Sequence, residues 1–196
     1  PIPLREVIHF KGAKEIMIAF FCYCALEQTV GLWASSYLVL ERGISETEAT
    51  RFASLFFFGI TFGRAVNGFM TMRFSDTRLI YMGQVIVGIG ILLIVLPVGN
   101  VAALAGFVAI GVGCAPIYPC IIHSTPAYFG KERSQAMVGV QMASAYVGTS
   151  VMPPVFGLIA GRISIALLPV YLSAILLLMV IMYYRVNRLT GRRELC

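Results

Sequence analysis

Long apolar segments alternate with short polar segments along the whole chain. The longest, residues 79–130, contains 52 residues without a single Lys, Arg, Asp or Glu. One bilayer-spanning helix needs only about 20 apolar residues. This length therefore predicts two helices, with a turn at Pro97-Val98-Gly99-Asn100. Applied to the whole sequence, the pattern predicts six membrane spans, at about 16–40, 50–72, 79–96, 101–125, 134–161 and 164–184.

The polar segments divide the chain into three parts. Residues 1–13 are predicted to be a cytoplasmic lead-in or linker, residues 14–187 a six-helix transmembrane bundle, and residues 188–196 a basic cytoplasmic tail. Ser45, with Glu48 three residues later, forms a capping-box pattern, which predicts that the second helix starts there.

The fourth predicted span contains the sequence GVGCAPIYPCIIHSTP. Pro116 and Pro119 each remove a helix hydrogen-bond donor and should kink or unwind the helix. Tyr118 and His123 lie in and just past that break. Interrupted helices often form the binding sites of transporters, so this segment is a candidate site.

Two of the spans also carry a G-x-x-x-G motif. Gly59 and Gly63 form the first, and Gly157 and Gly161 form the second. Small residues at this spacing let the backbones of membrane helices approach closely. We therefore expect these glycines to lie at contacts between helices.

Composition agrees with a membrane protein. The chain is 59% hydrophobic and only 12% charged, whereas an ordinary soluble domain is about 25% charged. The net charge is +6, which in a soluble protein would suggest nucleic acid as a partner. Because basic residues gather in the cytoplasmic loops of membrane proteins, a topological origin is favoured here and no nucleic-acid partner is expected.

Lysine and arginine are distributed unevenly between the two sides of the predicted bundle. If the six spans alternate in direction, one side holds eleven of them: Arg5, Lys11, Lys14, Arg73, Arg78, Lys131, Arg133, Arg185, Arg188, Arg192 and Arg193. The other side holds only Arg42, Arg51 and Arg162. The positive-inside rule then predicts a multi-pass protein of the plasma (inner) membrane with both termini in the cytoplasm.

The sequence shows no pattern typical of a metal, cofactor or catalytic site. The five cysteines have neither zinc-ligand spacing nor the arrangement of a disulfide framework. Neither His-Glu-x-x-His nor Gly-x-Ser-x-Gly occurs. We therefore expect no enzyme activity, no metal ion and no cofactor.

Two ionisable side chains lie within the apolar spans. Glu27 is near the middle of the first span, and Arg64 is in the second, with Asn67 one helical turn later. Charged groups at such depth are costly and usually face a bundle interior or water. Glu27 is interpreted either as a proton-coupling or substrate-binding carboxylate or as a structural partner of Arg64. Counted along the helices from the same side of the membrane, Glu27 lies about 20 Å deep and Arg64 about 14 Å deep. If the two helices touch, these depths would let the two side chains meet.

Other side chains in the spans have two interpretations each. Amides either hydrogen-bond a polar solute or join neighbouring helices; they are Gln28, Asn67 and Gln141. Tyr118 and Trp33 either stack on a solute or pack between helices. His123 either shuttles protons or lies at the membrane interface.

Several segments resemble a known family. They are GITFGRAVNGF in the second span, GVGCAPIYP in the fourth and GVQMASAYVGTSVMPPVFGLIAG in the fifth. With six spans in this order, residues 14–187 resemble the C-terminal half of a major facilitator superfamily transporter. The first span, FFCYCALEQTVGLWASSYL, is similar to the first helix of the second half in the fucose-permease-like branch, which often has a tyrosine and a glutamate at this spacing.

The loop after the second span matches the superfamily only in part. Gly68 and Arg73 fit the pattern G-x-x-x-D-R-x-G-R-R. The acid, glycine and base of that pattern are replaced by Met72, Ser75 and Asp76. The resemblance therefore does not imply a strict gating role for this loop.

The resemblance implies an all-α membrane fold in which six helices form 3+3 inverted repeats. Two such halves enclose a central cavity in the superfamily. Because the chain starts at Pro1 and not at methionine, we expect the N-terminal six-helix half either earlier in the same polypeptide or in a second chain.

The function implied is secondary active transport of a small polar solute, with a sugar favoured, coupled to protons and operating by alternating access. The residues expected around the solute are Glu27, Arg64, Asn67, Tyr118 and Gln141. One alternative is a multidrug or metabolite exporter of the same superfamily, which 13 Phe and 9 Met would suit. The other is a non-transporting membrane scaffold, although a scaffold has no need of Glu27 at mid-depth.

Overall fold

The computed structural model describes residues 4–191 of the chain. Within these residues the protein is helical throughout and has no β-strand. The long helices are α2 (Ala13–Arg42), α3 (Glu46–Met70), α4 (Asp76–Val95), α5 (Asn100–Phe129), α6 (Lys131–Arg162) and α7 (Leu168–Leu189). A short helix α1 (Leu4–Val7) precedes them, and a 3-10 turn η1 (Ile165–Leu167) leads into α7. All six long helices are long and apolar enough to cross a membrane, which confirms the predicted fold class.

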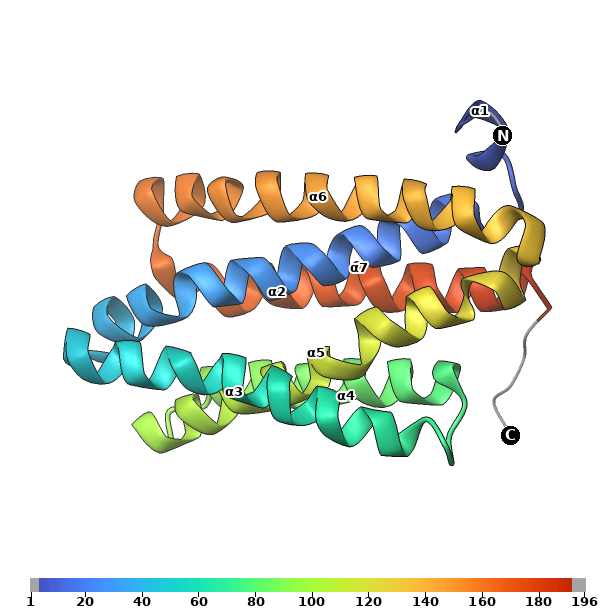
Figure 1. Ribbon diagram of the computed structural model, residues 1–196. Helices are drawn as coiled ribbons and strands as arrows, with labels where there is room; N and C mark the ends of the chain where they lie inside the picture. Colours follow the sequence, from blue (N-terminus) through green and yellow to red (C-terminus); the bar gives the residue numbers. More distant parts are fainter. Residues whose placement is uncertain (1–3, 192–196) are drawn as a thin grey trace.

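The helices pack as two inverted triplets. The central helix α2 of the first triplet makes its most extensive contacts with α6 and α7 of the second. In the same way, α5 of the second triplet packs mainly on α3 and α4 of the first. Exchanging α2 with α5, α3 with α6 and α4 with α7 reproduces this pattern, and α2 and α5 run in opposite directions (Figure 1). The predicted 3+3 inverted repeat is confirmed.

Basic residues gather at one end of the bundle, which we call the basic end. This end comprises the start of α2, the end of α7 and the loops α3–α4 and α5–α6, all on the right in Figure 1. Its exposed Lys and Arg include Lys11, Lys14, Arg73, Arg78, Lys131 and Arg133. The opposite end holds Arg42, Arg51 and Arg162.

Glycines of the first G-x-x-x-G motif set the distance between α3 and α5. A Cβ atom added to Gly63 would lie 2.5 Å from the Cβ of Ala115, and one added to Gly59 would lie 2.7 Å from the carbonyl oxygen of Val108. Only a residue without a side chain fits at this separation. The second motif is used only at Gly157, which faces the Trp33 ring, since nothing lies within 4 Å of a Cβ at Gly161.

The prolines of α5 do not unwind the helix. It continues from Asn100 to Phe129 with Pro116, Pro119 and Pro126 inside it. Figure 1 shows that the yellow second half leaves the line of the green first half and rises toward α2 and α6. Of the two expected outcomes, the structure therefore shows a change of direction and not a break, because a missing hydrogen bond bends a helix that its neighbours still hold.

A polar cluster holds the end of α5 at the basic end. The hydroxyl of Tyr128 donates to Asn187 Oδ1 at 2.8 Å, and the hydroxyls of Tyr128 and Tyr183 are 3.0 Å apart. Asn187 Nδ2 donates to the hydroxyl of Tyr81 at 3.3 Å. These contacts join α5, α7 and α4 beyond the bend, so the second half of α5 has a fixed position.

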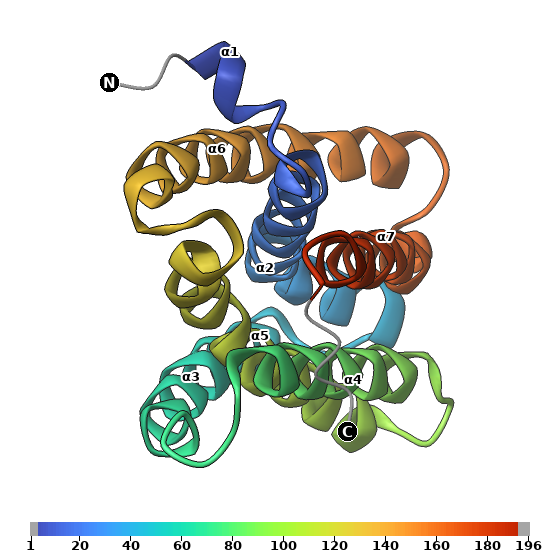
Figure 2. The same ribbon diagram turned by 90° about the vertical axis from the view of Figure 1, so that its right-hand side faces the viewer.

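The outer faces of α3 and α6 carry large apolar side chains without cover. In the view from the basic end, α3 and α6 lie on either side of the second half of α5 (Figure 2). The exposed apolar side chains of these two helices include Phe57, Phe58, Phe62, Phe69, Tyr146, Val147 and Leu158. Such a surface suits lipid or another apolar protein surface.

Candidate functional site

A cavity of about 530 Å³ opens between α2, α3, α5 and α6 and is called the central cavity here. Its lining contains one acid, one base and several hydroxyl, amide and aromatic groups: Tyr23, Cys24, Glu27, Gln28, Arg64, Tyr118, Met142, Ala145, Tyr146, Thr149 and Ser150. Binding sites for small molecules commonly have volumes of about 300–1,000 Å³. The cavity is therefore large enough for a small solute.

Glu27 and Arg64 meet across this cavity. Arg64 Nη2 lies 3.9 Å from Glu27 Oε2, and the hydroxyl of Tyr23 donates a hydrogen bond to the same oxygen. The side chain of Glu27 is 26% exposed and that of Arg64 is 48% exposed. An ion pair this open is screened by solvent and contributes little to stability. Both groups are consequently accessible to a solute in the cavity.

The sequence explains how these two side chains come to the same place. Tyr23 and Glu27 are four residues apart, so they lie on one face of α2. Arg64 directly follows Gly63, whose missing side chain lets α3 lie close to α5. The geometric possibility that the sequence left open, a pair between Glu27 and Arg64, is present in the structure.

Aromatic rings form one wall of the central cavity. The ring of Tyr118 lies 5.1 Å from that of Phe20 and 6.2 Å from that of Tyr23, measured between centroids. Its hydroxyl donates to Met142 Sδ at 3.4 Å. Tyr118 therefore combines the two interpretations given above, since it packs against α2 and also faces the cavity.

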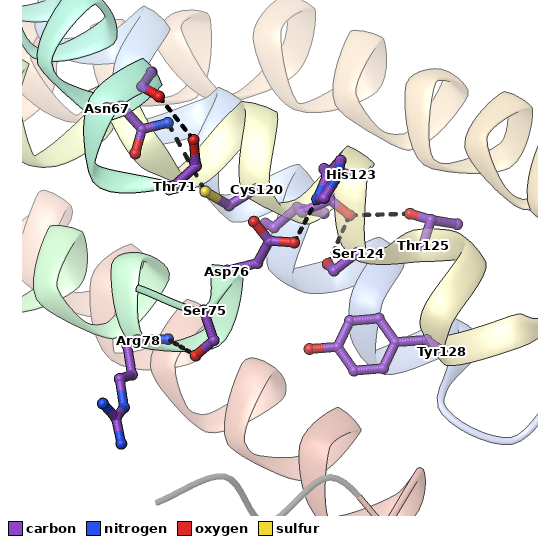
Figure 3. A network of polar contacts seen from close by, with 12 residues as sticks. Asn67, Thr71, Ser75, Asp76, Arg78, Cys120, His123, Ser124, Thr125 and Tyr128 are labelled. Atoms are coloured by element: carbon purple, nitrogen blue, oxygen red, sulfur yellow. Dashed lines mark hydrogen bonds and ion pairs between the residues drawn. The ribbon is translucent and has the colours of Figure 1, made fainter. Parts of the chain in front are cut away.

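A second cavity, of about 480 Å³, continues toward the basic end and is called the basic-end cavity. Arg64 and Tyr118 line both cavities. The other lining residues are Asn67, Gly68, Thr71, Asp76, Pro119, Cys120 and His123. Figure 3 shows five of the lining residues around the start of α4 and the second half of α5: Asn67, Thr71, Asp76, Cys120 and His123.

Two polar contacts cross the basic-end cavity. His123 Nδ1 lies 2.6 Å from Asp76 Oδ2, and Asn67 Nδ2 lies 3.9 Å from Cys120 Sγ. Asn67 is buried, and its Oδ1 has no hydrogen-bond partner among the described residues. Both Asn67 and His123 thus lie by a cavity, but not the one that contains Glu27.

Gln141 and Trp33 line neither of these two cavities, although Trp33 lines a separate one beside Pro153 and Pro154. Gln141 is fully buried, and its Oε1 accepts a hydrogen bond of 3.1 Å from Thr125 Oγ1. Trp33 Nε1 donates to the carbonyl oxygen of Pro153 at 3.1 Å, and its ring packs edge-on against Phe156. Both side chains join α6 to a neighbouring helix, which corresponds to the structural interpretation left open by the sequence. Gln28, in contrast, lines the central cavity.

The described residues contain no group of three or more His, Cys, Asp or Glu side chains that could hold a metal ion. The arrangement suits non-covalent binding between helices and proton exchange at carboxylate and imidazole groups.

Comparison with known proteins identifies the family. Residues 16–194 match the model of the Major Facilitator Superfamily. The chain belongs to this superfamily. No curated protein matches the sequence.

Solved transporters of this superfamily's fold superpose on the chain. A mutant of the peptide transporter POT in complex with alafosfalin superposes with a TM-score of 0.83 and 15% sequence identity, covering 97% of this chain and 43% of that one. The E. coli fucose:proton symporter superposes with a TM-score of 0.74 and 14% identity, covering 93% and 44%. A POT family transporter in complex with a thioalcohol-conjugated peptide gives 0.74 and 16%, covering 93% and 38%.

The chain therefore spans less than half the length of these transporters. With six helices in two inverted triplets, it corresponds to one half of the Major Facilitator Superfamily fold. At these identities the likeness concerns the fold and does not choose between a sugar and a peptide as solute.

The sequence predicted that α6 contributes to the site through Gln141, but it missed the face of α6 that lines the central cavity. Ala145 and Tyr146 each lie three or four residues from both Met142 and Thr149, so the four residues share a face of α6. The more polar neighbouring face instead packs on α2, where Ser144 Oγ donates to the carbonyl oxygen of Met17 at 3.0 Å. The helical spacing shows that these residues share a face of α6, but it does not show that this face lines a cavity.

Asp76 was also missed as a site residue. In the sequence it is only a departure from the superfamily loop pattern. In the structure it is the first residue of α4, where Ser75 caps the helix by accepting from the backbone N–H of Arg78 at 3.4 Å. Its partner His123 lies 47 positions later in the chain, so no local pattern points to the contact.

Proposed function

We propose that this half belongs to a secondary active transporter that moves a small polar solute by alternating access. The observation that carries the proposal is the partly exposed Glu27–Arg64 pair in a cavity between four helices. A charged pair inside a membrane bundle is costly to maintain, and such residues are typically found on transport pathways. An N-terminal six-helix half, in the same polypeptide or in a second chain, would close the cavity against the uncovered apolar faces of α3 and α6.

A sugar is the solute that the central cavity suits best. Gln28, Tyr146, Thr149 and Ser150 supply uncharged donors and acceptors for hydroxyl groups. Tyr118 presents an aromatic ring at the same cavity. The fold shared with the E. coli fucose:proton symporter is compatible with this choice.

Proton coupling would act through Glu27. While ionised, the carboxylate attracts Arg64 and accepts the hydrogen bond from Tyr23. A proton on Glu27 removes the charge that attracts Arg64 and frees the guanidinium to move or to bind the solute. Protonation would thus be linked to the position of α3 relative to α2, a difference between states of the kind that alternating access requires.

The alternative is an exporter of drugs or metabolites. Met142 and the rings of Tyr23, Tyr118 and Tyr146 give the central cavity a substantial apolar and aromatic lining. Flexible methionine and aromatic side chains suit solutes of varied shape. An exporter of this kind would bind solutes with few hydroxyl groups.

The proposed location is the plasma (inner) membrane, with the basic end in the cytoplasm. The excess of Lys and Arg at the basic end supports this orientation, because positively charged loops remain on the cytoplasmic side. Both termini would then be cytoplasmic.

The test is uptake of labelled monosaccharides into vesicles that contain the assembled transporter, with and without a pH gradient. Glu27→Gln should abolish gradient-driven accumulation and retain solute exchange across the membrane, because glutamine keeps the size and loses the titrating group. The matched control is Glu46→Gln, at the exposed start of α3 far from the cavity, which should behave as the wild type. Accumulation by Glu27→Gln at the wild-type level would refute proton coupling through Glu27.

A further inference from the structure

A second ionisable pair lies in the basic-end cavity, whereas Glu27 lies in the central cavity. His123 in α5 and Asp76 at the start of α4 are in hydrogen-bond contact, with His123 Nδ1 2.6 Å from Asp76 Oδ2. The side chain of His123 is 82% exposed and that of Asp76 is 18% exposed. Asp76 also occupies the N-terminus of α4, where the helix dipole favours a negative charge.

The two pairs share one pathway. Glu27 lines the central cavity, the His123–Asp76 pair lines the basic-end cavity, and Arg64 with Tyr118 lines both. Asn67 and Thr71 add polar groups between Arg64 and Asp76. Water in the two cavities would therefore connect Glu27 to His123 without crossing an apolar barrier.

We propose that the His123–Asp76 pair is a second proton-binding site, at which protons from Glu27 are held before they enter the cytoplasm. This inference rests on the proposed function. The proton leaves the carboxyl group of Glu27 for cavity water, binds the imidazole of His123 beside the carboxylate of Asp76, and then passes to cytoplasmic water. Histidine suits this role because its charge changes near neutral pH. One proton enters and one leaves, and no group changes its oxidation state.

The titratable and charged groups that face His123 come from α3, α4 and α5. Asp76 from α4 is in direct contact with it, whereas Arg64 from α3 faces it only across a solvent-accessible cavity, where its charge is screened. Cys120 and Tyr118 from α5 complete the titratable lining, and neither α6 nor α7 contributes a residue to it. Figure 3 shows the side chain of Arg78 extending away from the pair.

The experiment varies the pH on the cytoplasmic side of vesicles that contain the assembled transporter, from about 6 to about 8. Net uptake and equilibrium exchange of a labelled monosaccharide are measured for the wild type, His123→Gln and Asp76→Asn. The wild type should show net uptake that depends on this pH. His123→Gln should lose the dependence and retain exchange. Asp76→Asn should alter the dependence, because the imidazole then lacks the carboxylate that contacts it. His9→Gln, the matched control at the basic end outside both cavities, should retain the wild-type profile.

The outcomes separate this inference from the proposed function. If the wild type accumulates solute and Glu27→Gln does not, but His123→Gln keeps the wild-type pH profile, the second site is refuted and the function stands. If His123→Gln loses exchange as well, the pair is structural and the second site is refuted. If the wild type shows no gradient-driven accumulation, the proposed function and this inference both fall.

Discussion

Replacing Gly63 with alanine should push α3 away from α5. The new Cβ would lie 2.5 Å from the Cβ of Ala115 and 3.1 Å from the carbonyl oxygen of Val112. Ordinary contact begins at 3.4 Å, so the closer of these contacts is about 0.9 Å too short. Since both neighbouring atoms belong to the rigid part of α5, the strain is relieved only by a shift of one helix against the other.

The magnitude follows from two opposing effects. Overpacking of this kind costs about 1–3 kcal/mol, and the higher helix propensity of alanine offsets about 0.5–1 kcal/mol of it. A net loss of about 0–2.5 kcal/mol in the free energy of unfolding is expected from these two ranges. Arg64 follows directly in the chain and lies only 3.9 Å from Glu27, so a shift of α3 also changes the geometry of this pair.

The assay is the free energy of unfolding in lipid bicelles, with Gly161→Ala as the control. Gly161 is the second glycine of the other G-x-x-x-G motif, and a Cβ there meets nothing within 4 Å. Its replacement should therefore be neutral or slightly stabilising. Combining Gly63→Ala with Ala115→Gly should recover part of the loss, because the closest methyl group is then absent. Equal stability of Gly63→Ala and Gly161→Ala, or no recovery in the double variant, would refute the packing argument.

Two further predictions concern the polar side chains. Arg64 and Glu27 lie 3.9 Å apart. Glu27→Arg and Arg64→Glu should each lower the folded yield, because each brings two like charges together at this place. The combined swap should restore part of the folded yield. A swap as damaging as both single changes contradicts the pairing. Thr125→Val leaves buried Gln141 Oε1 without its donor and should cost about 1–3 kcal/mol of unfolding free energy with no change in the KM of transport. A raised KM at wild-type stability would show that Gln141 contacts the solute after all.

The fold could be derived from the sequence to a large extent. Charge-free length and the breakers Pro97 and Gly99 define the spans, because a bilayer imposes both a minimum length and an apolar composition. Ser45 caps α3 as predicted, with the backbone N–H of Glu48 donating to its Oγ at 3.4 Å. The bend of α5 without a break was harder to foresee, since neighbouring helices decide whether a proline only bends a helix.

The candidate site, like the fold, could be predicted from the sequence only in part. Glu27 and Arg64 were found because an ionisable residue in an apolar span is unusual. Asp76 was not found as a site residue, because acidic residues are common at the polar ends of membrane helices. Its partner His123 lies on another helix, so no local pattern points to the contact. Gln141 is buried against Thr125 and lines neither cavity, which the polarity of its sequence neighbours could not reveal.

The inverted repeat places both central helices, which carry the two ionisable pairs, against the outer helices of the first triplet. Each central helix packs mainly on the opposite triplet, so α2 and α5 lie between the repeats. Glu27 is carried by α2 and His123 by α5, and each pairs with a residue of the first triplet's outer helices, α3 or α4. A movement of α3 and α4 relative to the central helices would therefore change both pairs together. This is the mechanical condition for passing a proton from one pair to the other during a single transport cycle.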